Sequence, residues 1–278
     1  MTCPSVGWAV QDIEPGGQAL KAIILAGGLG TRMREETEFR PKPLVEIGGQ
    51  PVIWHIMKVF EHYGIRDFVV AAGYKSKMLK EYFLNYDAWS NDVSIRIGAS
   101  DGVTVHRKGQ SESWNVTVVD TGALTPTGGR VLRAASYLEE SEPFMVSYGD
   151  GLANINIGDL VDFHSTSGSL ATVSAVQPRT RFGVMDIDID GQVNRFEEKP
   201  QLQGWINIGF FVFEYEALRF LTEDSVLEAE PLKHMAHSKE LSAYRHDGFW
   251  EPMDTYREFV QLNELWESGS APWKVWEN

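Results

Sequence analysis

The chain has 278 residues, 43% hydrophobic and 23% charged, which suits one large α/β domain or two small ones. Its net charge of −14 argues against broad binding to nucleic acid or to anionic lipid, so neither a nucleic-acid partner nor a membrane partner is expected. A single cysteine excludes a disulfide framework, no run nears the roughly 18 apolar residues of a membrane span, and the cytoplasm is the expected location.

The first part of the chain alternates predicted strands and helices. Residues 1–18 contain proline and glycine without periodicity and are predicted to be a loosely ordered extension of one domain at 19–278. The predicted elements that follow are a strand at 20–26, a helix at about 52–63, a strand at 67–73 and a helix at 77–86. This order indicates βαβ units and a mostly parallel sheet.

The rest of the chain contains further predicted elements, and after residue 151 it is predicted to be more antiparallel. The predicted elements are strands at 103–105, 116–119 and 144–148 with a helix at 130–138, then strands at 170–176, 183–189, 193–196 and 205–213, and a last helix at 256–267. Asp190-Gly191 is a hairpin turn signal between two of these strands. The predicted fold is therefore α/β: a Rossmann-like, mostly parallel mixed sheet flanked by helices, with a smaller antiparallel region.

A glycine-rich segment follows the first predicted strand. Its glycines let the backbone turn tightly, so that freed N–H groups can face a phosphate, and its arginine places a charged fork beside them. The alternative is a glycine turn that joins strand to helix without a ligand. A dinucleotide-binding fingerprint is excluded because its third glycine is missing, and the P-loop pattern is absent. The segment reads Leu25-Ala26-Gly27-Gly28-Leu29-Gly30-Thr31-Arg32.

A lysine between two prolines lies shortly after this segment. Pro41 and Pro43 deny Lys42 a helical or central-strand setting and favour an extended loop. Taken alone, such a residue is more often a surface lysine. Here it belongs to a local basic island, Arg32, Arg34, Arg40 and Lys42, that could hold a phosphate within an acidic protein.

These motifs together resemble the signature of the sugar nucleotidyltransferases. Residues 41–49 are similar to the glucose-1-phosphate cytidylyltransferases in particular, and the resemblance extends from Leu20 to the C-terminus. Further matching segments lie at 54–58, 114–117, 119–122, 127–130, 148–151, 181–183, 198–200, 249–255 and 271–274. The chain departs from the family pattern at Leu44 (methionine in the family), Ile208 (glycine) and Glu251 (glutamine or a similar polar residue).

The resemblance implies a reaction and its partners. The oxygen of a sugar phosphate attacks the α-phosphorus of a nucleoside triphosphate and expels pyrophosphate; here the substrates would be CTP and glucose 1-phosphate and the product CDP-glucose. It further implies a homo-oligomer whose product feeds 3,6-dideoxyhexose synthesis for surface polysaccharide. The alternatives are the same chemistry with UTP, dTTP or another sugar phosphate, and a non-catalytic regulator that binds nucleotide sugar.

The resemblance also assigns the catalytic residues. The backbone of the glycine loop, with Arg32, would hold the triphosphate, and Lys42 would counter the charge that develops on the α-phosphate. Asp150 and Asp254 would share one Mg²⁺, an ion that prefers oxygen ligands and takes the rest from phosphates and water. Two alternatives remain: Asp150 as a turn residue, and Asp254 as the N-cap of the last helix.

Further residues are assigned to substrate binding. The pyrimidine would contact the loop at 125–130, where two adjacent glycines allow close approach to a flat ring; a glycine start to a helix is the alternative. The remaining substrate-binding residues implied are Thr125 and Arg130 for the base, Gly149, Lys199 for the sugar phosphate, Glu198 for the sugar hydroxyls, and Asn207 and Trp250 as weaker sugar contacts.

Overall fold

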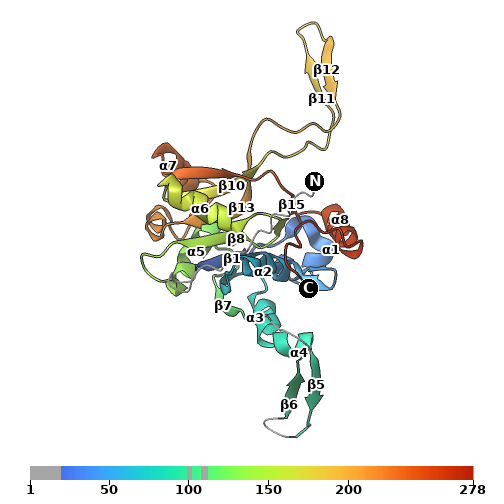
Figure 1. Ribbon diagram of the computed structural model, residues 1–278, viewed down its shortest axis with the longest axis vertical. Coiled ribbons are helices and arrows are strands. Elements are labelled where there is room, and N and C mark those ends of the chain that lie inside the picture. The colour runs from blue at the N-terminus through green and yellow to red at the C-terminus, as the bar shows by residue number, and fades with distance from the viewer. Residues whose placement is uncertain (1–19, 99–101, 108–111, 278) are drawn as a thin grey trace, which may run out of the picture.

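The computed structural model describes residues 20–98, 102–107 and 112–277, and the predicted extension at 1–18 lies outside this range. A central sheet with helices on both sides forms the body, and a hairpin arm projects from each end of its long axis (Figure 1). No helix in the described ranges is long and apolar enough to cross a membrane. The predicted α/β class is confirmed.

The central sheet places the first strand of the chain in its middle. Across the described residues it has seven strands, in the spatial order β14 (Leu241–Arg245), β10 (Ala171–Val176), β13 (Ile206–Phe213), β8 (Phe144–Tyr148), β1 (Lys21–Ala26), β4 (Asp67–Ala72) and β7 (Asn115–Asp120). From β1 the chain adds β4 and β7 on one side, and β8 begins the other side. A reversal of this kind creates a crevice at the carboxyl ends of the two central strands.

The sheet is more parallel than the sequence indicates. Within the described chain, β13 alone runs against its neighbours β8 and β10, whereas β10 pairs in parallel with β14. The predicted antiparallel character after residue 151 is confirmed for β13 with β8 and β10, whereas β14, which was not predicted, pairs in parallel with β10. Short antiparallel pairs are formed by β2 (Glu46–Ile47) with β3 (Gln50–Pro51) and by β9 (Gly151–Ala153) with β15 (Trp250–Pro252).

Helices cover both faces of the sheet. They are α1 (Arg34–Thr37), α2 (Val52–His62), α3 (Ser76–Leu84), α4 (Tyr86–Ser90), α5 (Thr127–Ala134), α6 (Ile157–Ser167), α7 (Glu230–His237) and α8 (Tyr256–Glu267), with short 3₁₀ turns η1 (Thr31–Met33), η2 (Lys42–Leu44), η3 (Ala135–Tyr137) and η4 (Tyr215–Phe220). The last helix has the predicted bounds. In contrast, α5 begins three residues before its predicted start, and α6 and α7 were not predicted.

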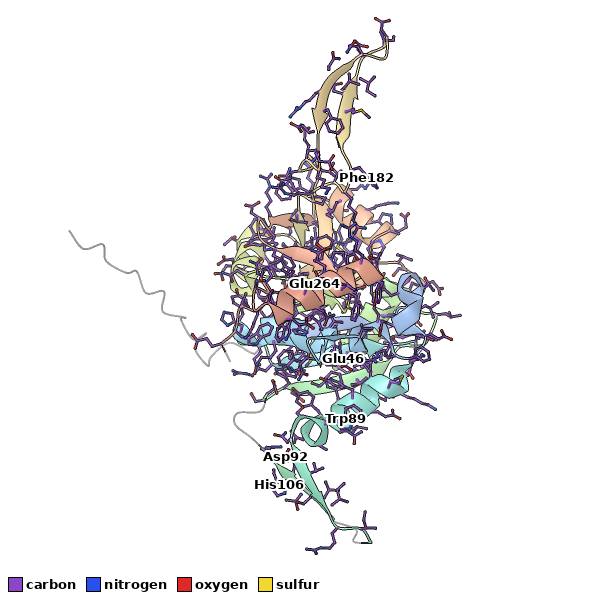
Figure 2. The ribbon with its side chains drawn as sticks, turned by 90° about the vertical axis from the view of Figure 1, so that its right-hand side faces the viewer. Glu46, Trp89, Asp92, His106, Phe182 and Glu264 are labelled. Carbon is purple, nitrogen blue, oxygen red and sulfur yellow. The ribbon has the colours of Figure 1, made fainter. Side chains whose placement is uncertain are left out.

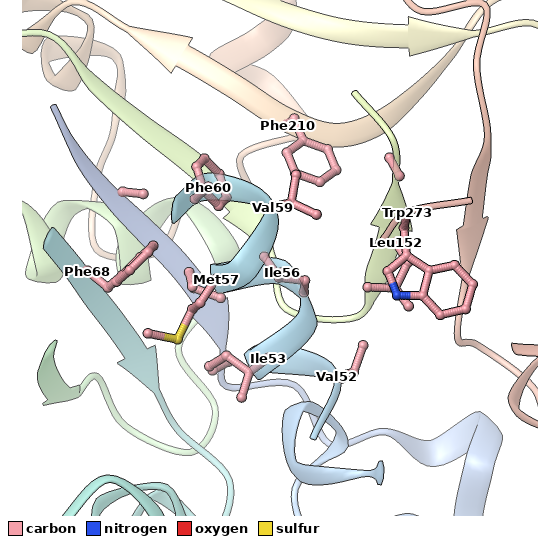
Figure 3. Packing of buried hydrophobic residues seen from close by; sticks show 14 of the residues in the cluster. Val52, Ile53, Ile56, Met57, Val59, Phe60, Phe68, Leu152, Phe210 and Trp273 are labelled. Atoms are coloured by element: carbon pink, nitrogen blue, oxygen red, sulfur yellow. The ribbon is translucent and has the colours of Figure 1, made fainter. Parts of the chain in front are cut away.

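The alternation of side chains along β1 divides the core into two clusters. Ala22, Ile24 and Ala26 face the cluster packed by α2, α3, α6 and α8, whereas Ile23 and Leu25 face the one packed by α5 and α7. Figure 3 shows the first cluster, in which apolar side chains of α2 pack between the sheet and Trp273. Because β1 is buried on both faces, its sequence is a continuous apolar run.

The two arms expose apolar side chains. One is β11 (Val184–Ile187) paired with β12 (Val193–Glu197), and the other is β5 (Asp92–Ile95) paired with β6 (Val103–His106). Figure 2 shows the two arms extending from opposite ends of the body. The hairpin turn predicted at Asp190-Gly191 is confirmed, with Gly191 at a φ of +85°. The apolar side chains exposed on and beside the arms include Trp89, Ile95, Ile97, Val103, Phe182, Met185, Ile187, Ile189 and Phe196.

Candidate functional site

A cavity of about 390 Å³ lies at the carboxyl ends of β1 and β8, where the strand order reverses. This is the position at which open α/β sheets usually bind their ligands. Its walls are formed by Leu25, Ala26, Gly27, Gly28, Lys42, Pro43, Thr125, Pro126, Thr127, Arg130, Tyr148, Gly149, Asp150 and Glu228. A smaller cavity of about 240 Å³ lies at the opposite ends of the strands, beside the first residues of β1, β4 and β8.

The glycine loop forms one wall of the cavity. Gly30 has a φ of +64°, a conformation that favours glycine, and the chain then enters η1 with Thr31, while Leu29 is exposed beside it. A side chain on Gly27 would overlap the guanidinium of Arg130. The side chain of Arg32 lies outside the described part of the structure, so its predicted contact with the triphosphate stays a prediction.

Arg130 supports the glycine loop through hydrogen bonds of its side chain. Its buried guanidinium donates to the carbonyl oxygens of Gly27 (3.0 Å) and Gly122 (2.8 Å) and to the hydroxyl of Thr121 (2.6 Å). These partners follow β1 and β7, so one charged side chain ties the ends of separate strands together. The sequence did not indicate this role. The predicted contact of Arg130 with a base stays a prediction, because the residue also lines the cavity.

The ammonium of Lys42 lies between two carboxylates. Its Nζ donates to Oδ2 of Asp150 at 2.5 Å and to Oδ1 of Asp254 at 2.6 Å. Burial is the largest single influence and acts to lower the pKa of Lys42, yet the two carboxylates outweigh it and the pKa is raised. Lys42 is therefore a fixed positive charge at neutral pH, and folding brings together three residues predicted from distant parts of the sequence.

A short strand pair holds the two carboxylates in place. Pairing of β9 with β15 sets Gly151 opposite Pro252, and the amide of Met253 donates to the carbonyl of Asp150 at 2.8 Å. Gly149 is packed against β1, where an added Cβ would lie 2.6 Å from the carbonyl oxygen of Leu25. Asp150 is thus part of a tight turn and also directs its carboxylate at Lys42.

Asp254 precedes the helix α8 without capping it. The N-cap is Thr255, whose hydroxyl accepts from the amide of Glu258, so the alternative of Asp254 as N-cap is wrong. The buried carboxylate of Glu258 accepts from the amides of Asp254 (2.8 Å) and Thr255 (2.9 Å), and it also pairs with Arg181 at the root of the β11–β12 arm. The Asp254 carboxylate is left to meet Lys42.

A second charge network lines the opposite side of the cavity. Oε1 of Glu228 accepts from the Tyr148 hydroxyl at 2.5 Å, and Oε2 accepts from Thr127 at 2.7 Å. Asn207 donates to the Tyr148 hydroxyl at 2.9 Å, which brings one predicted residue to this network although it does not line the cavity. Thr125 lines the cavity as predicted. Sequence reasoning missed both residues: Tyr148 lies in the matching segment 148–151 but was given no role, and no motif surrounds Glu228.

The adjacent glycines of the loop at 125–130 pack closely against another segment of the chain. An added Cβ on Gly128 would lie 2.7 Å from the carbonyl oxygen of Ser225, and one on Gly129 would overlap the carbonyl of Glu223. The close approach is therefore between α5 and the segment before α7, and the alternative of a glycine start to a helix is confirmed, while the contact of this loop with a pyrimidine stays a prediction. Because the glycines let the segment 223–225 pack against α5, Glu228, which follows this segment, lies in the cavity wall.

Glu198, Lys199 and Trp250, which are predicted to contact the sugar phosphate substrate, do not line the cavity. The side chains of Glu198 and Lys199 are 62% and 61% exposed near the root of the β11–β12 arm, and Lys199 has a φ of +50°. Trp250 is half-buried in β15, and its indole N–H has no hydrogen-bond partner among the described residues. Beside it, burial and then Glu258 raise the pKa of Glu251. The sugar contacts of these residues stay predictions.

Comparisons with known proteins identify the family. The family model of the nucleotidyl transferases matches residues 21–266, nearly the whole described chain. The chain belongs to the nucleotidyl transferase family. This nucleotidyl transferase is 49% identical to the glucose-1-phosphate cytidylyltransferase of Salmonella typhi, over 93% of the chain and 100% of that relative. It is 44% identical to the probable glucose-1-phosphate cytidylyltransferase of Bacillus subtilis, over 92% of the chain and 100% of that relative.

Solved structures support the fold of this nucleotidyl transferase. HddC from Yersinia pseudotuberculosis superposes with a TM-score of 0.62 at 23% identity, over 89% of this chain and 99% of that chain. An apo UDP-glucose pyrophosphorylase superposes with a TM-score of 0.64 at 15% identity, over 91% of this chain and 99% of that chain. At these identities the likeness establishes the shared architecture.

Proposed function

We propose that this nucleotidyl transferase moves a cytidylyl group from CTP to glucose 1-phosphate in the cytoplasm, releasing pyrophosphate and forming CDP-glucose. The observation that carries the proposal is the Lys42 ammonium held between Asp150 and Asp254 beside the glycine loop, within one cavity. The names of the relatives from Salmonella typhi and Bacillus subtilis support the choice of nucleotide and sugar.

The two carboxylates fit a Mg²⁺ ion. Both oxygens that meet Lys42 come from carboxylates, the hard ligands that Mg²⁺ prefers, and they converge on one atom. Among the described residues no group of three or more His, Cys, Asp or Glu could hold a metal. A two-carboxylate site suits Mg²⁺ that takes its other ligands from phosphates and water. When bound, the ion would supply charge neutralisation to the phosphates.

The chain's own groups supply positioning and charge. Both substrates are polyanions, and the attacking phosphate oxygen is already ionised at neutral pH, so no general base is required. Backbone N–H groups of the glycine loop would bind the triphosphate, and Lys42 would stabilise the charge that builds on the α-phosphate during attack. Because Arg130 braces the loop, these donors are set before the ligand arrives.

This geometry bears on one of the two alternatives. A non-catalytic regulator has little use for a lysine clamped by two carboxylates at the phosphate end of the cavity. The same chemistry with another nucleotide or sugar phosphate keeps every one of these groups, so an assay must decide between the nucleotides.

We expect CTP to give the highest kcat/KM of the four ribonucleotides and dTTP, with glucose 1-phosphate and Mg²⁺ as the other reactants. The measurement is the initial rate of pyrophosphate release. Equal or greater activity with dTTP would contradict the choice of CTP while leaving nucleotidyl transfer intact. No pyrophosphate release with any nucleotide would contradict the enzymatic proposal itself.

We also infer that the chain forms a homo-oligomer. An isolated two-stranded hairpin is marginally stable in water, yet both arms extend from the body and carry exposed apolar side chains such as Ile97 and Ile189. A second copy offers matching apolar arms to cover them. The native mass, measured by sedimentation equilibrium, should be a multiple of the chain mass, and a mass equal to one chain would contradict the inference.

A further inference from the structure

The Glu228 carboxylate is presented to the cavity as an acceptor and nothing else. Each of its oxygens takes one hydrogen bond from a hydroxyl, Oε1 from Tyr148 and Oε2 from Thr127. Each of those hydroxyl oxygens accepts from a separate donor: Tyr148 from the side-chain amide of Asn207, and Thr127 from the backbone amide of Leu227, both at 2.9 Å. The hydroxyl protons are therefore committed to Glu228.

Neither hydroxyl can reverse its role without losing a hydrogen bond. The Asn207 amide nitrogen and the Leu227 amide can only donate, so Tyr148 and Thr127 must direct their own protons at Glu228. Burial, followed by the charge of Glu228, raises the pKa of Tyr148, which keeps this hydroxyl protonated. A carboxylate oxygen that accepts one hydrogen bond has room for another, and Glu228 can offer it to a ligand in the cavity.

The position of Glu228 separates it from the phosphate groups. The glutamate lies before α7, on the face of the sheet packed by α5 and α7, whereas Asp254 lies before α8, on the opposite face. The cavity includes both Lys42 and Glu228, so it runs between these two sides. Lys42 and the glycine-loop amides would hold the triphosphate, with Mg²⁺ offsetting the charge of Asp150 and Asp254. Glu228 instead accepts from hydroxyls, so a triphosphate is disfavoured beside it and the nucleobase is assigned to that side.

We propose that Glu228 selects the base of the nucleotide, accepting a hydrogen bond from the exocyclic amino group of cytosine and repelling the carbonyl that uracil and thymine carry at the same position. This rests on the proposed function, because it presupposes a pyrimidine nucleotide in the cavity. Cytosine presents an N4 amino donor, whereas uracil and thymine present an O4 acceptor. A fixed acceptor distinguishes these two edges, and a site built for one hydrogen-bonding group rejects its mismatch strongly.

The test is Glu228→Gln, with kcat/KM measured for CTP and for UTP at saturating glucose 1-phosphate. Gln keeps the size, and its single oxygen still accepts from one of the two hydroxyls, while its N–H₂ group loses the hydrogen bond to the other hydroxyl and can donate to O4. We expect the CTP-to-UTP ratio to fall by about 10- to 100-fold, with a loss for CTP and a gain for UTP. The matched control is Glu230→Gln on α7, an exposed glutamate that pairs with Lys233, and it should leave the ratio unchanged.

Each outcome decides the proposal. A CTP-to-UTP ratio within about twofold of wild type overturns it, given that base-edge pairs contribute more than this. A changed CTP-to-dCTP ratio with an unchanged CTP-to-UTP ratio also overturns it, since Glu228 would then bind the ribose. If the unmodified chain transfers neither nucleotide, the proposed function fails and this inference with it, whereas an active wild type with an indifferent Glu228→Gln removes this inference alone. The unfolding temperature of both variants checks that the fold is retained.

Discussion

Replacing Lys42 with Met is expected to lower kcat at least about 100-fold, which corresponds to about 2.7 kcal/mol of transition-state stabilisation. The ammonium lies in the cavity between the Asp150 and Asp254 carboxylates, and Met keeps much of the stem while removing that charge. The affinity for CTP should change much less, because the glycine loop still offers its backbone donors. Steady-state kinetics with both substrates varied gives kcat and KM separately.

Two controls make the Lys42 result interpretable. Removal of the ammonium leaves Asp150 and Asp254 facing each other, so the unfolding temperature of Lys42→Met must be measured with and without Mg²⁺. Lys233→Met, on the exposed surface of α7, removes a lysine charge outside the site and should be nearly silent. A Lys42→Met variant that raises KM and keeps kcat would show that the lysine contributes to ground-state binding alone.

Changing Asp150 or Asp254 to Asn is expected to lower kcat by about 10² to 10⁴, because metal assistance to phosphoryl chemistry is worth several kcal/mol. The double variant should be far less than multiplicatively worse, since the first substitution already breaks the shared site. The kcat of all three variants is measured against Mg²⁺ concentration, with Asp162→Asn on α6 as the matched control. Near-wild-type activity in Asp254→Asn, or multiplicative losses in the double variant, would rule out a shared metal site.

In the same variants the unfolding temperature should depend on the number of substitutions in the opposite way to kcat. After one substitution the buried Lys42 ammonium keeps a carboxylate partner, so the unfolding temperature should fall by a few degrees at most. After both, the charge has no anionic partner in this cluster, and an unpaired buried charge costs about 3 kcal/mol or more. In a domain of this size that is a fall of roughly 6–12 °C. Activity is thus lost mainly at the first substitution, and stability mainly at the second.

The helices and strands that could be predicted from the sequence are those with a clear hydrophobic pattern. Strands buried on both faces, such as β1 and β8, are continuous apolar runs, and α8 has an amphipathic pattern with Thr255 and Glu258 as its capping box. The helix α6 was not predicted, because Gly158 and a run of Ser and Thr residues interrupt its apolar face. Its flanking signals were present, Asn156 as N-cap and Gly168 as the C-terminal glycine with a φ of +66°.

The candidate site was predictable where family motifs contain it. Lys42, Asp150 and Asp254 each lie in a recognisable segment, although their contact depends on the β9–β15 pairing, which the sequence does not display. The role of Arg130 beneath the glycine loop and the position of Glu228 depend on long-range packing. Glu228 is one of many acidic residues in the chain, and nothing near it in the sequence distinguishes it from a surface glutamate.

The packing of Gly128 and Gly129 against the chain at Glu223 and Ser225 has a practical consequence for redesign. The wall of the cavity that holds Glu228 comes from the connection between β13 and α7, whereas the Lys42 cluster is built from η2, the end of β8 and the start of α8. The two halves of the cavity are therefore modular. A library confined to positions 224, 226 and 228 could seek new base preferences while the Lys42 cluster, the Ser225 contact of Gly128 and the buried Leu227 are left as they are.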